Sequence, residues 1–445
     1  MNREILRIAL PNIISNITVP LMGIASTAIA GRWSDDSAAA IGALAIGVSI
    51  FNFIYWNCSF VRMGTGGITA QAFGAKDYKA CTAILARSLA VSAVLGLAVL
   101  IFRHPLGEAA LRMMNGGEIA RQYFYARIWA VPAGIVLFGF NGWYTGMQNA
   151  VIPMAIAITV NTVQIVCSFW FAFGFDLGIV GIAYGAVAAQ YTGVALALLL
   201  LAVRYGRLLV PVGAREVFDP AAMKRFFVIN SDIMLRTLCI VAVYTFFTAA
   251  SARMENKVLL AVNTLLMQLF TLFSYMSDGF AYAAEALTGR FIGARQVDNL
   301  RRCIRGCLVW SMGVSLLFVT AYLAGWRSLL SIFVSAPADL PEGPEQVAQL
   351  IIDTAGSYIG WVIAIPLAAS VPFLLDGIMV GATQTRLMRN SMIPATAAYF
   401  AIFYALEPIA GNNALWLAFT SYMFLRGIIL YAMSDRLKRV YEKAL

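Results

Sequence analysis

Long apolar runs recur along the whole sequence and constrain its fold more than any other feature. Each is roughly 20 residues long and carries few or no charges, and together they occupy most of the 445-residue chain. In hydrocarbon every backbone polar group needs a partner within its own segment, so each run predicts a membrane-spanning helix. A β-barrel would instead show short alternating segments. Twelve spans are expected, near 8–30, 41–61, 82–102, 122–146, 151–174, 178–203, 226–250, 258–283, 304–325, 351–380, 391–408 and 413–433.

Basic residues are distributed unevenly between the two sides of this layout. The chain has 32 Lys and Arg residues and a formal net charge of +10. The two termini and the loops after even-numbered spans carry 21 of these residues, whereas the opposite loops carry 7. This asymmetry predicts that both termini are cytoplasmic. The positive charge therefore orients the chain in a membrane, and we expect no nucleic-acid partner.

Two similar segments indicate an internal repeat. "GGITAQAFGAKDYKA" (66–80) follows the second span, and "AEALTGRFIGARQVDN" (284–299) follows the eighth. Further along, "NGWYTGMQ" (141–148) matches "DGIMVGAT" (376–383), and both contain Gly-x-x-x-Gly. The first pair is offset by 219 residues and the second by 235, so one insertion, in the acidic loop 335–350, accounts for the change. A single Gly-x-x-x-Gly also serves ordinary helix packing, but anchors in the same order indicate duplication.

The repeat predicts the organisation of the chain. Six spans per half is an even number, so both halves have the same orientation and are related by an axis along the membrane normal. We expect an amino-terminal lobe at 1–203 and a carboxy-terminal lobe at 226–445. A basic linker at 204–225, which contains Pro211 and Pro220, joins them.

With these motifs in hand, the chain resembles the multidrug and toxic compound extrusion (MATE) family and, within it, the DinF-like bacterial branch. The resemblance implies two six-helix lobes around a central cleft, alternating access driven by H⁺ or Na⁺, small organic substrates and a bacterial inner membrane. We expect a monomer in contact with membrane lipids. The motifs are "RMGTGGITAQAFGAKD" (62–77), "NSDIMLRTL" (230–238), "SDGFAYAAEALTGRFIGAR" (277–295), "LLDGIMVGATQTRLMRNSM" (374–392) and "NNALWLAFTSYMFLRG" (412–427).

The sequence departs from the family pattern in the amino-terminal lobe. In the DinF-like branch the first helix usually reads Val-Asp-Thr, where this chain has Ala25-Ser26-Thr27. The fifth helix usually carries an Asp four residues after an Asn, where this chain has Ile165 after Asn161. Both acids that the resemblance would assign to coupling in this lobe are absent.

Acidic residues within the spans concentrate in the carboxy-terminal lobe. An ionised side chain in hydrocarbon costs about 3 to more than 10 kcal/mol, so such acids face the interior or pair. We predict a cation-coupling cluster of Asp232, Asp278 and Asp376, together with Arg236. Asp232 and Arg236 are four residues apart and can pair, either as a static ion pair or as a switchable one. Glu285 is expected to bridge to Arg290 or Arg295.

Two of these acids have alternative interpretations. Asp278 lies between Tyr275 and Tyr282, whose hydroxyls could donate hydrogen bonds, so it is either a coupling or substrate-cation group or a structural acceptor. Asp376 occupies the repeat position of Asn141, which shows that packing alone does not require an acid there. Arg426 is expected to neutralise an acid of the same lobe.

The amino-terminal lobe retains neutral polar side chains within its spans. These residues either line a substrate site or form interhelical hydrogen bonds, and the aromatic ones either stack on planar cations or belong to the core. The predicted substrate-binding set is Asn52, Asn57, Asn141, Asn161, Gln164 and Tyr55 of this lobe, together with Tyr275 of the carboxy-terminal lobe.

These features favour a secondary antiporter that exports amphipathic or cationic organic compounds in exchange for H⁺, with Na⁺ as the alternative ion. No Gly-x-x-x-x-Gly-Lys-Ser/Thr loop is present to bind a nucleotide, and one His excludes most metal and nucleophile–base sites, so we expect no enzyme and no cofactor. The alternatives are a flippase for lipid-linked precursors, or a membrane receptor or enzyme without transport.

Overall fold

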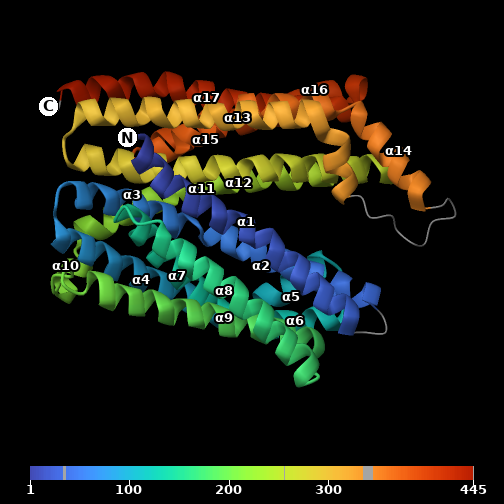
Figure 1. Cartoon of the computed structure of the whole chain (residues 1–445), viewed down its shortest axis with the longest axis horizontal. Coiled ribbons are helices and arrows are strands. Elements are labelled where there is room, and N and C mark those ends of the chain that lie inside the picture. The colour runs from blue at the N-terminus through green and yellow to red at the C-terminus, as the bar shows by residue number, and fades with distance from the viewer. Residues whose placement is uncertain (34–36, 255, 334–343, 444–445) are drawn as a thin grey trace.

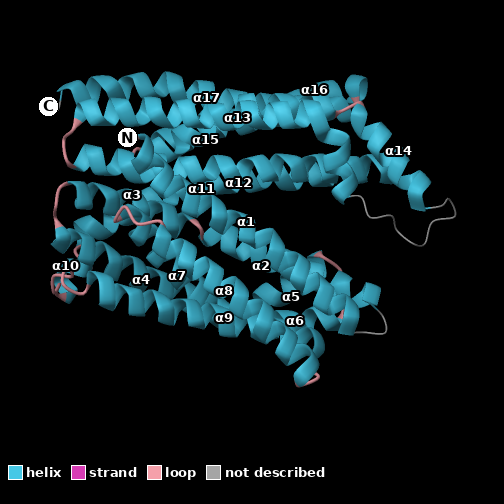
Figure 2. Ribbon diagram, viewed as in Figure 1, coloured by secondary structure: helices cyan, strands magenta, loops and turns pink. Residues whose placement is uncertain are grey.

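The computed structural model describes residues 1–33, 37–254, 256–333 and 344–443, and their regular elements are all helices (Figure 2). The first ten α-helices are α1 (Asn2–Trp33), α2 (Ser37–Cys58), α3 (Phe60–Gly74), α4 (Tyr78–Ile101), α5 (Arg103–Met113), α6 (Glu118–Arg127), α7 (Val131–Gly146), α8 (Val151–Phe169), α9 (Gly178–Leu200) and α10 (Ala214–Val217). The others are α11 (Pro220–Arg253), α12 (Lys257–Gly293), α13 (Val297–Phe333), α14 (Pro344–Gly356), α15 (Ile359–Gly381), α16 (Thr385–Ala410) and α17 (Asn412–Lys443).

Twelve helical segments of the described chain are long and apolar enough to cross a membrane, which confirms the predicted number of spans. The predicted ninth and tenth spans differ in course from the helices of the structure. The ninth span continues past a kink at Gly325 to the end of α13, because helical geometry resumes after that residue. The tenth predicted span crosses the break between α14 and α15. The insertion expected at 335–350 falls largely outside the described residues.

Short turns of other helix types interrupt one span and end two others. A 3₁₀ turn, η1 (Ile128–Ala130), precedes Pro132, which lies in the first turn of α7 rather than inside a continuous helix. This position suits proline, since its missing N–H would have no helical partner there. The π-helical turns η2 (Trp170–Gly174) and η3 (Leu201–Tyr205) extend α8 and α9.

The helices form two groups that meet along α1, α3 and α12 (Figure 1). One buried apolar cluster fills the carboxy-terminal group, and two further clusters fill the amino-terminal group. Helix α1 belongs to both groups: Ile5 and Ile13 join the carboxy-terminal cluster, whereas Ile29 joins an amino-terminal one. Both chain ends lie towards the same end of the molecule (Figure 1).

Glycines of the repeat make equivalent helix contacts in the two groups. A Cβ atom added to Gly142 of α7 would lie 2.2 Å from the carbonyl oxygen of Arg62 in α3. A Cβ atom added to Gly377 of α15 would lie 2.1 Å from the carbonyl oxygen of Ala281 in α12. The two pairs are related by the same offsets of 219 and 235 residues as the sequence motifs. Only glycine allows helices to approach this closely.

A second pair of glycines joins the two groups to each other. A Cβ atom on Gly74 of α3 would lie 2.0 Å from the carbonyl oxygen of Arg290 in α12. Reciprocally, a Cβ atom on Gly293 of α12 would lie 2.0 Å from the carbonyl oxygen of Gln71 in α3. Equivalent residues therefore exchange roles across the contact, as in a two-fold symmetric interface.

The short helix α10 is attached to the amino-terminal group. Arg87 of α4 is buried and donates hydrogen bonds to the carbonyl oxygens of Val217 at 2.8 Å and Glu216 at 3.1 Å. Lys79 of α4 also pairs with the Glu216 carboxylate at 2.7 Å. The segment before α11 is thus tied to α4 by both backbone and side-chain contacts.

A buried amide network connects three helices of the carboxy-terminal group. Asn263 of α12 donates a hydrogen bond to the Ser251 hydroxyl at the end of α11, at 2.7 Å. It exchanges bonds with Asn412 of α17 at 2.7 and 3.0 Å and accepts one from the Trp416 indole at 2.9 Å. Asn263 is only 1% exposed, so these bonds replace hydration that the side chain has lost.

We expect Asn263→Ala to lower the free energy of unfolding by about 1–3 kcal/mol, because it leaves the buried polar groups of Ser251, Asn412 and Trp416 short of a partner. Thermal unfolding in detergent measures the change. The control is Thr264→Ala at the next, exposed position, whose hydroxyl bonds only within its own helix. Equal unfolding temperatures for the two variants would contradict the role given to the network.

Candidate functional site

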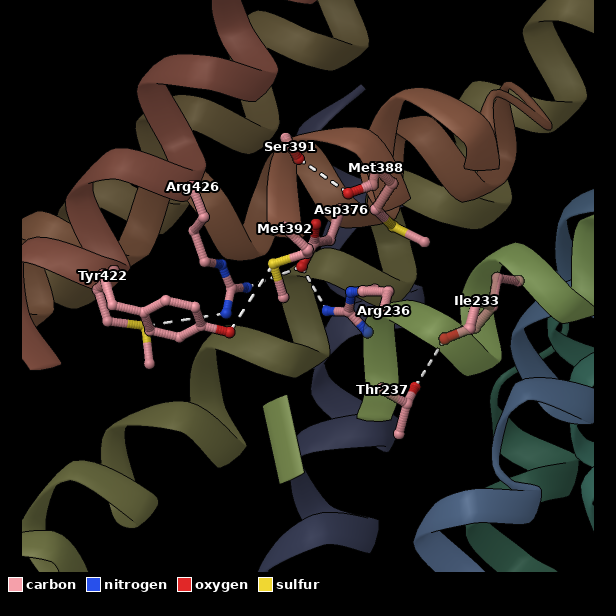
Figure 3. Close-up of polar contacts among 10 residues, drawn as sticks. Ile233, Arg236, Thr237, Asp376, Met388, Ser391, Met392, Tyr422 and Arg426 are labelled. Carbon is pink, nitrogen blue, oxygen red and sulfur yellow. Dashed lines mark hydrogen bonds and ion pairs between the residues drawn. The ribbon is translucent and has the colours of Figure 1, made fainter. Parts of the chain in front are cut away.

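Asp376 lies between two arginines inside the carboxy-terminal group (Figure 3). Its Oδ2 atom accepts a hydrogen bond from Arg426 Nη2 at 2.7 Å and another from Arg236. Arg236 comes from α11, Asp376 from α15 and Arg426 from α17, so one carboxylate joins three helices. The expectation that Arg426 neutralises an acid of its own lobe is confirmed by this ion pair.

This arrangement leaves a local excess of positive charge. Two guanidinium groups share one carboxylate, and the side chains of Asp376 and Arg426 are only 7% and 3% exposed. The Nε atoms of Arg236 and Arg426 are buried and have no hydrogen-bond partner among the described residues. The rings of Phe373 and Tyr422 lie 5.2 and 5.9 Å from the Arg426 guanidinium carbon and offer it cation–π contact.

Asp278 lies near this excess charge. Arg62, Arg236 and Arg426 are all within electrostatic reach of its carboxylate. Its side chain is partly exposed, and within the described part of the chain it makes no hydrogen bond or ion pair. The hydrogen bond expected from Tyr282 is absent, because the Tyr282 ring lies beneath Arg62, 3.7 Å from the guanidinium carbon to the ring centroid.

The contact between Arg62 and Tyr282 crosses from one group of helices to the other, since Arg62 is on α3 and Tyr282 on α12. This contact places a cation of the amino-terminal group opposite Asp278 of the carboxy-terminal group. The charge of Asp278 therefore acts directly on the contact between the two groups.

Asp232 does not pair with Arg236, and that prediction is wrong. The Asp232 carboxylate accepts hydrogen bonds from Arg389 Nη1 at 2.6 Å and from the Thr385 hydroxyl at 3.0 Å, both on α16. Arg236 lies one helical turn further along α11 and turns to Asp376 instead. The predicted cluster of three aspartates is thus divided between an Asp278–Asp376 pair, which shares neighbouring arginines, and a separate Asp232.

Glu285 is not an interfacial acid bridging to Arg290 or Arg295, and this expectation is also wrong. It is 1% exposed, and its Oε1 atom has no hydrogen-bond partner among the described residues. A Cβ atom on Gly66 of α3 would lie 2.1 Å from this oxygen, so Glu285 fills the space that the glycine leaves. Arg290 pairs with Glu4 of α1 at 3.2 Å instead.

The polar residues predicted in the amino-terminal group occupy different environments. Asn161 donates a hydrogen bond to the Thr18 hydroxyl at 2.6 Å, which links α8 to α1. Gln164 is buried, and the Oδ1 atom of Asn141 is buried without a partner in the described chain. Asn57 donates to Phe53 of its own helix, and Asn52 is exposed. The structure thus does not gather the predicted set into one binding site.

The two predicted tyrosines also lie apart. Tyr55 of α2 packs edge-on against Phe138 of α7, with ring centroids 6.1 Å apart. Tyr275 of α12 accepts a hydrogen bond at its backbone carbonyl from Asn16 of α1 at 3.0 Å. Both rings are partly exposed, and Tyr275 is within electrostatic reach of Asp278. No group of three or more His, Cys, Asp or Glu in the described chain is placed to hold a metal ion.

Comparisons with known proteins agree with this architecture. The chain is 34% identical over 443 residues to DNA damage-inducible protein F of Escherichia coli K12, covering 98% of this chain and 92% of that protein. It is 22% identical to the probable multidrug resistance protein NorM of Deinococcus radiodurans, covering 96% and 94%. The crystal structure of MATE in the bent conformation matches with a TM-score of 0.85 at 17% identity, covering 99% of this chain and 96% of that one.

The described residues form an all-helical fold with twelve candidate spans, which defines a multi-pass membrane protein with the MATE fold. The family model that matches the chain describes transporters rather than enzymes. The MatE family model matches residues 11–170 and 233–405. The chain belongs to the MatE family, whose members move small organic compounds across membranes.

Proposed function

We propose that the chain is a proton-driven antiporter that exports amphipathic organic compounds and that Asp278 exchanges the proton. One observation carries this proposal: Asp278 is a partly exposed carboxylate without a bonded partner, while Asp376 beside it is held by two arginines. A group with water access and no fixed partner can exchange a proton, whereas the Asp376 carboxylate is already bonded to two arginines.

The same geometry suggests how a proton changes the conformation. Ionised Asp278 attracts Arg62 on the opposite group of helices and favours the arrangement with α3 and α12 close together. Protonation removes this attraction and favours the alternative arrangement. An ion drives transport only if it binds the two states with different affinities, and a charge located at the contact between the groups provides that difference.

A proton suits this site better than sodium. A bound Na⁺ requires several oxygen ligands in place of its hydration shell, as hard cations generally do. Three arginines lie within electrostatic reach of Asp278, and they repel a metal cation but not the neutral carboxyl group that a proton creates. Asp376 and Arg236 belong to the proposed coupling site as a bonded ion pair. Asp232 lies apart from this site.

We further propose that substrate contacts both groups, with Asn141, Asn161 and Gln164 as polar contacts and Tyr55 and Tyr275 as aromatic ones. The buried, unpaired Oδ1 atom of Asn141 supports this assignment, since it can accept a hydrogen bond from an ammonium or hydroxyl group. Asn52 and Asn57 are the weaker members of the set, because one is exposed and the other is bonded to its own helix.

The placement of the chain in the membrane belongs to the same proposal. We propose two lobes, 1–203 and 226–445, joined by the linker 204–225, in a monomer with both termini in the cytoplasm. The asymmetry of Lys and Arg supports the orientation. The equivalent glycine contacts of Gly142 and Gly377 support the division.

Transport by purified protein in vesicles tests the coupling role, with H⁺ and Na⁺ gradients imposed separately on a fluorescent cationic dye. We expect Asp278→Asn to reduce transport driven by the proton gradient roughly tenfold or more, because the variant cannot exchange a proton. The matched control is Asp298→Asn, an exposed acid just after the start of α13, which should transport at the wild-type rate. A wild-type rate for Asp278→Asn would overturn the assignment, and transport driven only by sodium would reassign the ion.

A further inference from the structure

Two adjoining pockets open at the end of the carboxy-terminal group where α11 and α16 begin. Their volumes are about 670 and 480 Å³, and they share Lys224, Val228, Asp232 and Arg386 in their walls. Arg389 also lines the first pocket, and Arg225 also lines the second. These pockets are separate from the Asp278–Asp376 pair, since neither is lined by those two residues.

The charge of the pocket walls is strongly positive. Lys224, Arg225, Arg386 and Arg389 face a single acid, Asp232. Arg389 is already bonded to Asp232, while Lys224 and Arg386 are exposed and have no bonded partner within the described part of the chain. Lys224 and Arg386 are therefore available to bind an anion, whereas Arg389 is occupied by its ion pair with Asp232.

The start of α16 adds hydrogen-bond donors on the same side. Its first turn contains Thr385 and Arg386, both of which line the second pocket. The amide groups of a helix's first turn lack helical acceptors and carry partial positive charge, which favours an anion. The pocket thus combines two free cations with the donor end of a helix.

The helix faces that continue from the pocket are apolar and exposed. Phe227 is 50% exposed and lines the first pocket. Leu235, one turn beyond Ser231 on α11, is 41% exposed, and Ile393, one turn beyond Arg389 on α16, is 54% exposed. Residues four apart share a helix face, so an apolar surface runs from the basic pocket along both helices.

We propose that this pocket binds the phosphate group of an anionic phospholipid, with the acyl chains lying along Phe227, Leu235 and Ile393. A basic pocket next to an exposed apolar surface matches both parts of such a molecule. Free phosphate would bind in the pocket but would not contact the adjoining apolar surface. Because a lipid contacts both, we favour a lipid over a soluble anion. The site depends on the placement of α11 and α16 in a membrane and not on the direction or coupling of transport.

Native mass spectrometry of the full chain in neutral detergent tests this proposal by titration with phosphatidylglycerol or phosphatidylcholine. We expect tighter binding of phosphatidylglycerol, and about 30-fold weaker binding of that lipid by Lys224→Gln/Arg386→Gln, since each basic group near a membrane surface contributes about fivefold. The matched control is Arg207→Gln/Arg215→Gln, which removes two exposed cations from the segment before α11 and should leave lipid binding unchanged.

Three outcomes would overturn the proposal. One is equal binding of the two lipids by the wild-type protein, and another is an equal loss of binding in the control variant. The third is displacement of the lipid by an equal concentration of inorganic phosphate, which would make the pocket a free-anion site. Thermal unfolding of each variant separates loss of the site from loss of the fold.

Discussion

Replacing Asp376 with alanine is expected to lower the free energy of unfolding by about 3–5 kcal/mol, because the buried Arg426 and the mostly covered Arg236 would lose their shared carboxylate. Arg426 is only 3% exposed, so its guanidinium cannot regain hydration without opening the α15–α17 contact. Thermal or chemical unfolding in detergent measures this loss, and transport should fall with it. This is among the largest effects that a single side chain of this protein should show.

A surface ion pair provides the control for this variant. Asp353 pairs with Arg327 at 3.5 Å, and both side chains are more than half exposed. Asp353→Ala should therefore change stability by about 1 kcal/mol or less. If Asp376→Ala unfolded at the wild-type temperature, the two arginines would have found another counter-charge, and Asp278 is the acid within their reach.

The second large effect is expected at the contact between the two groups of helices. Gly293→Ala should cost about 1–3 kcal/mol, because its Cβ atom would meet the Gln71 carbonyl oxygen at 2.0 Å and force α3 away from α12. Gly74→Ala should cost a similar amount through the equivalent contact with Arg290. Both variants should also lose most of their transport activity, since they separate the helices that carry Arg62 and Tyr282. Thermal unfolding and vesicle transport are the measurements.

Gly313→Ala separates this packing effect from the change in helix propensity. A Cβ atom on Gly313 of α13 would meet nothing within 4 Å. Because alanine favours helix over glycine by about 1 kcal/mol, this variant should be neutral or stabilised. A gain in stability for Gly293→Ala or Gly74→Ala would show that the two groups of helices do not rely on this close approach.

Much of the fold follows directly from the sequence, because hydrocarbon imposes one simple requirement on each span. The apolar runs predict twelve helices, and the offsets between motifs locate the glycines at which α7 meets α3 and α15 meets α12. Arg426 was predictable as a partner for an acid of its own lobe, since an isolated cation in a span is costly.

The candidate site was less predictable, because helix spacing indicates only local neighbours. Asp232 and Arg236 are one turn apart, yet each pairs across to another helix, with Arg389 and Asp376 respectively. Arg389 lay outside the predicted span at 391–408, although α16 already begins at Thr385. The helix begins before its apolar run, so basic residues just ahead of such a run are candidate partners for a buried acid.

The burial of Glu285 had a signal that only the repeat could reveal. With an offset of 219 residues, Glu285 is the counterpart of Gly66, and the structure places the two against each other. Because Glu285 lies near the end of a span, its position in the sequence indicates an interfacial acid. Its neighbours across the lobe contact, and not its own helix, determine that it is buried.

The reciprocal contact of Gly74 with Arg290 and of Gly293 with Gln71 has an evolutionary consequence. Two identical six-helix chains could form the same contact as a homodimer, with one set of residues serving both sides. Fusion of the copies into one polypeptide makes their association independent of protein concentration. It also frees each copy to change alone, so position 66 can be a glycine while its counterpart at 285 is a glutamate.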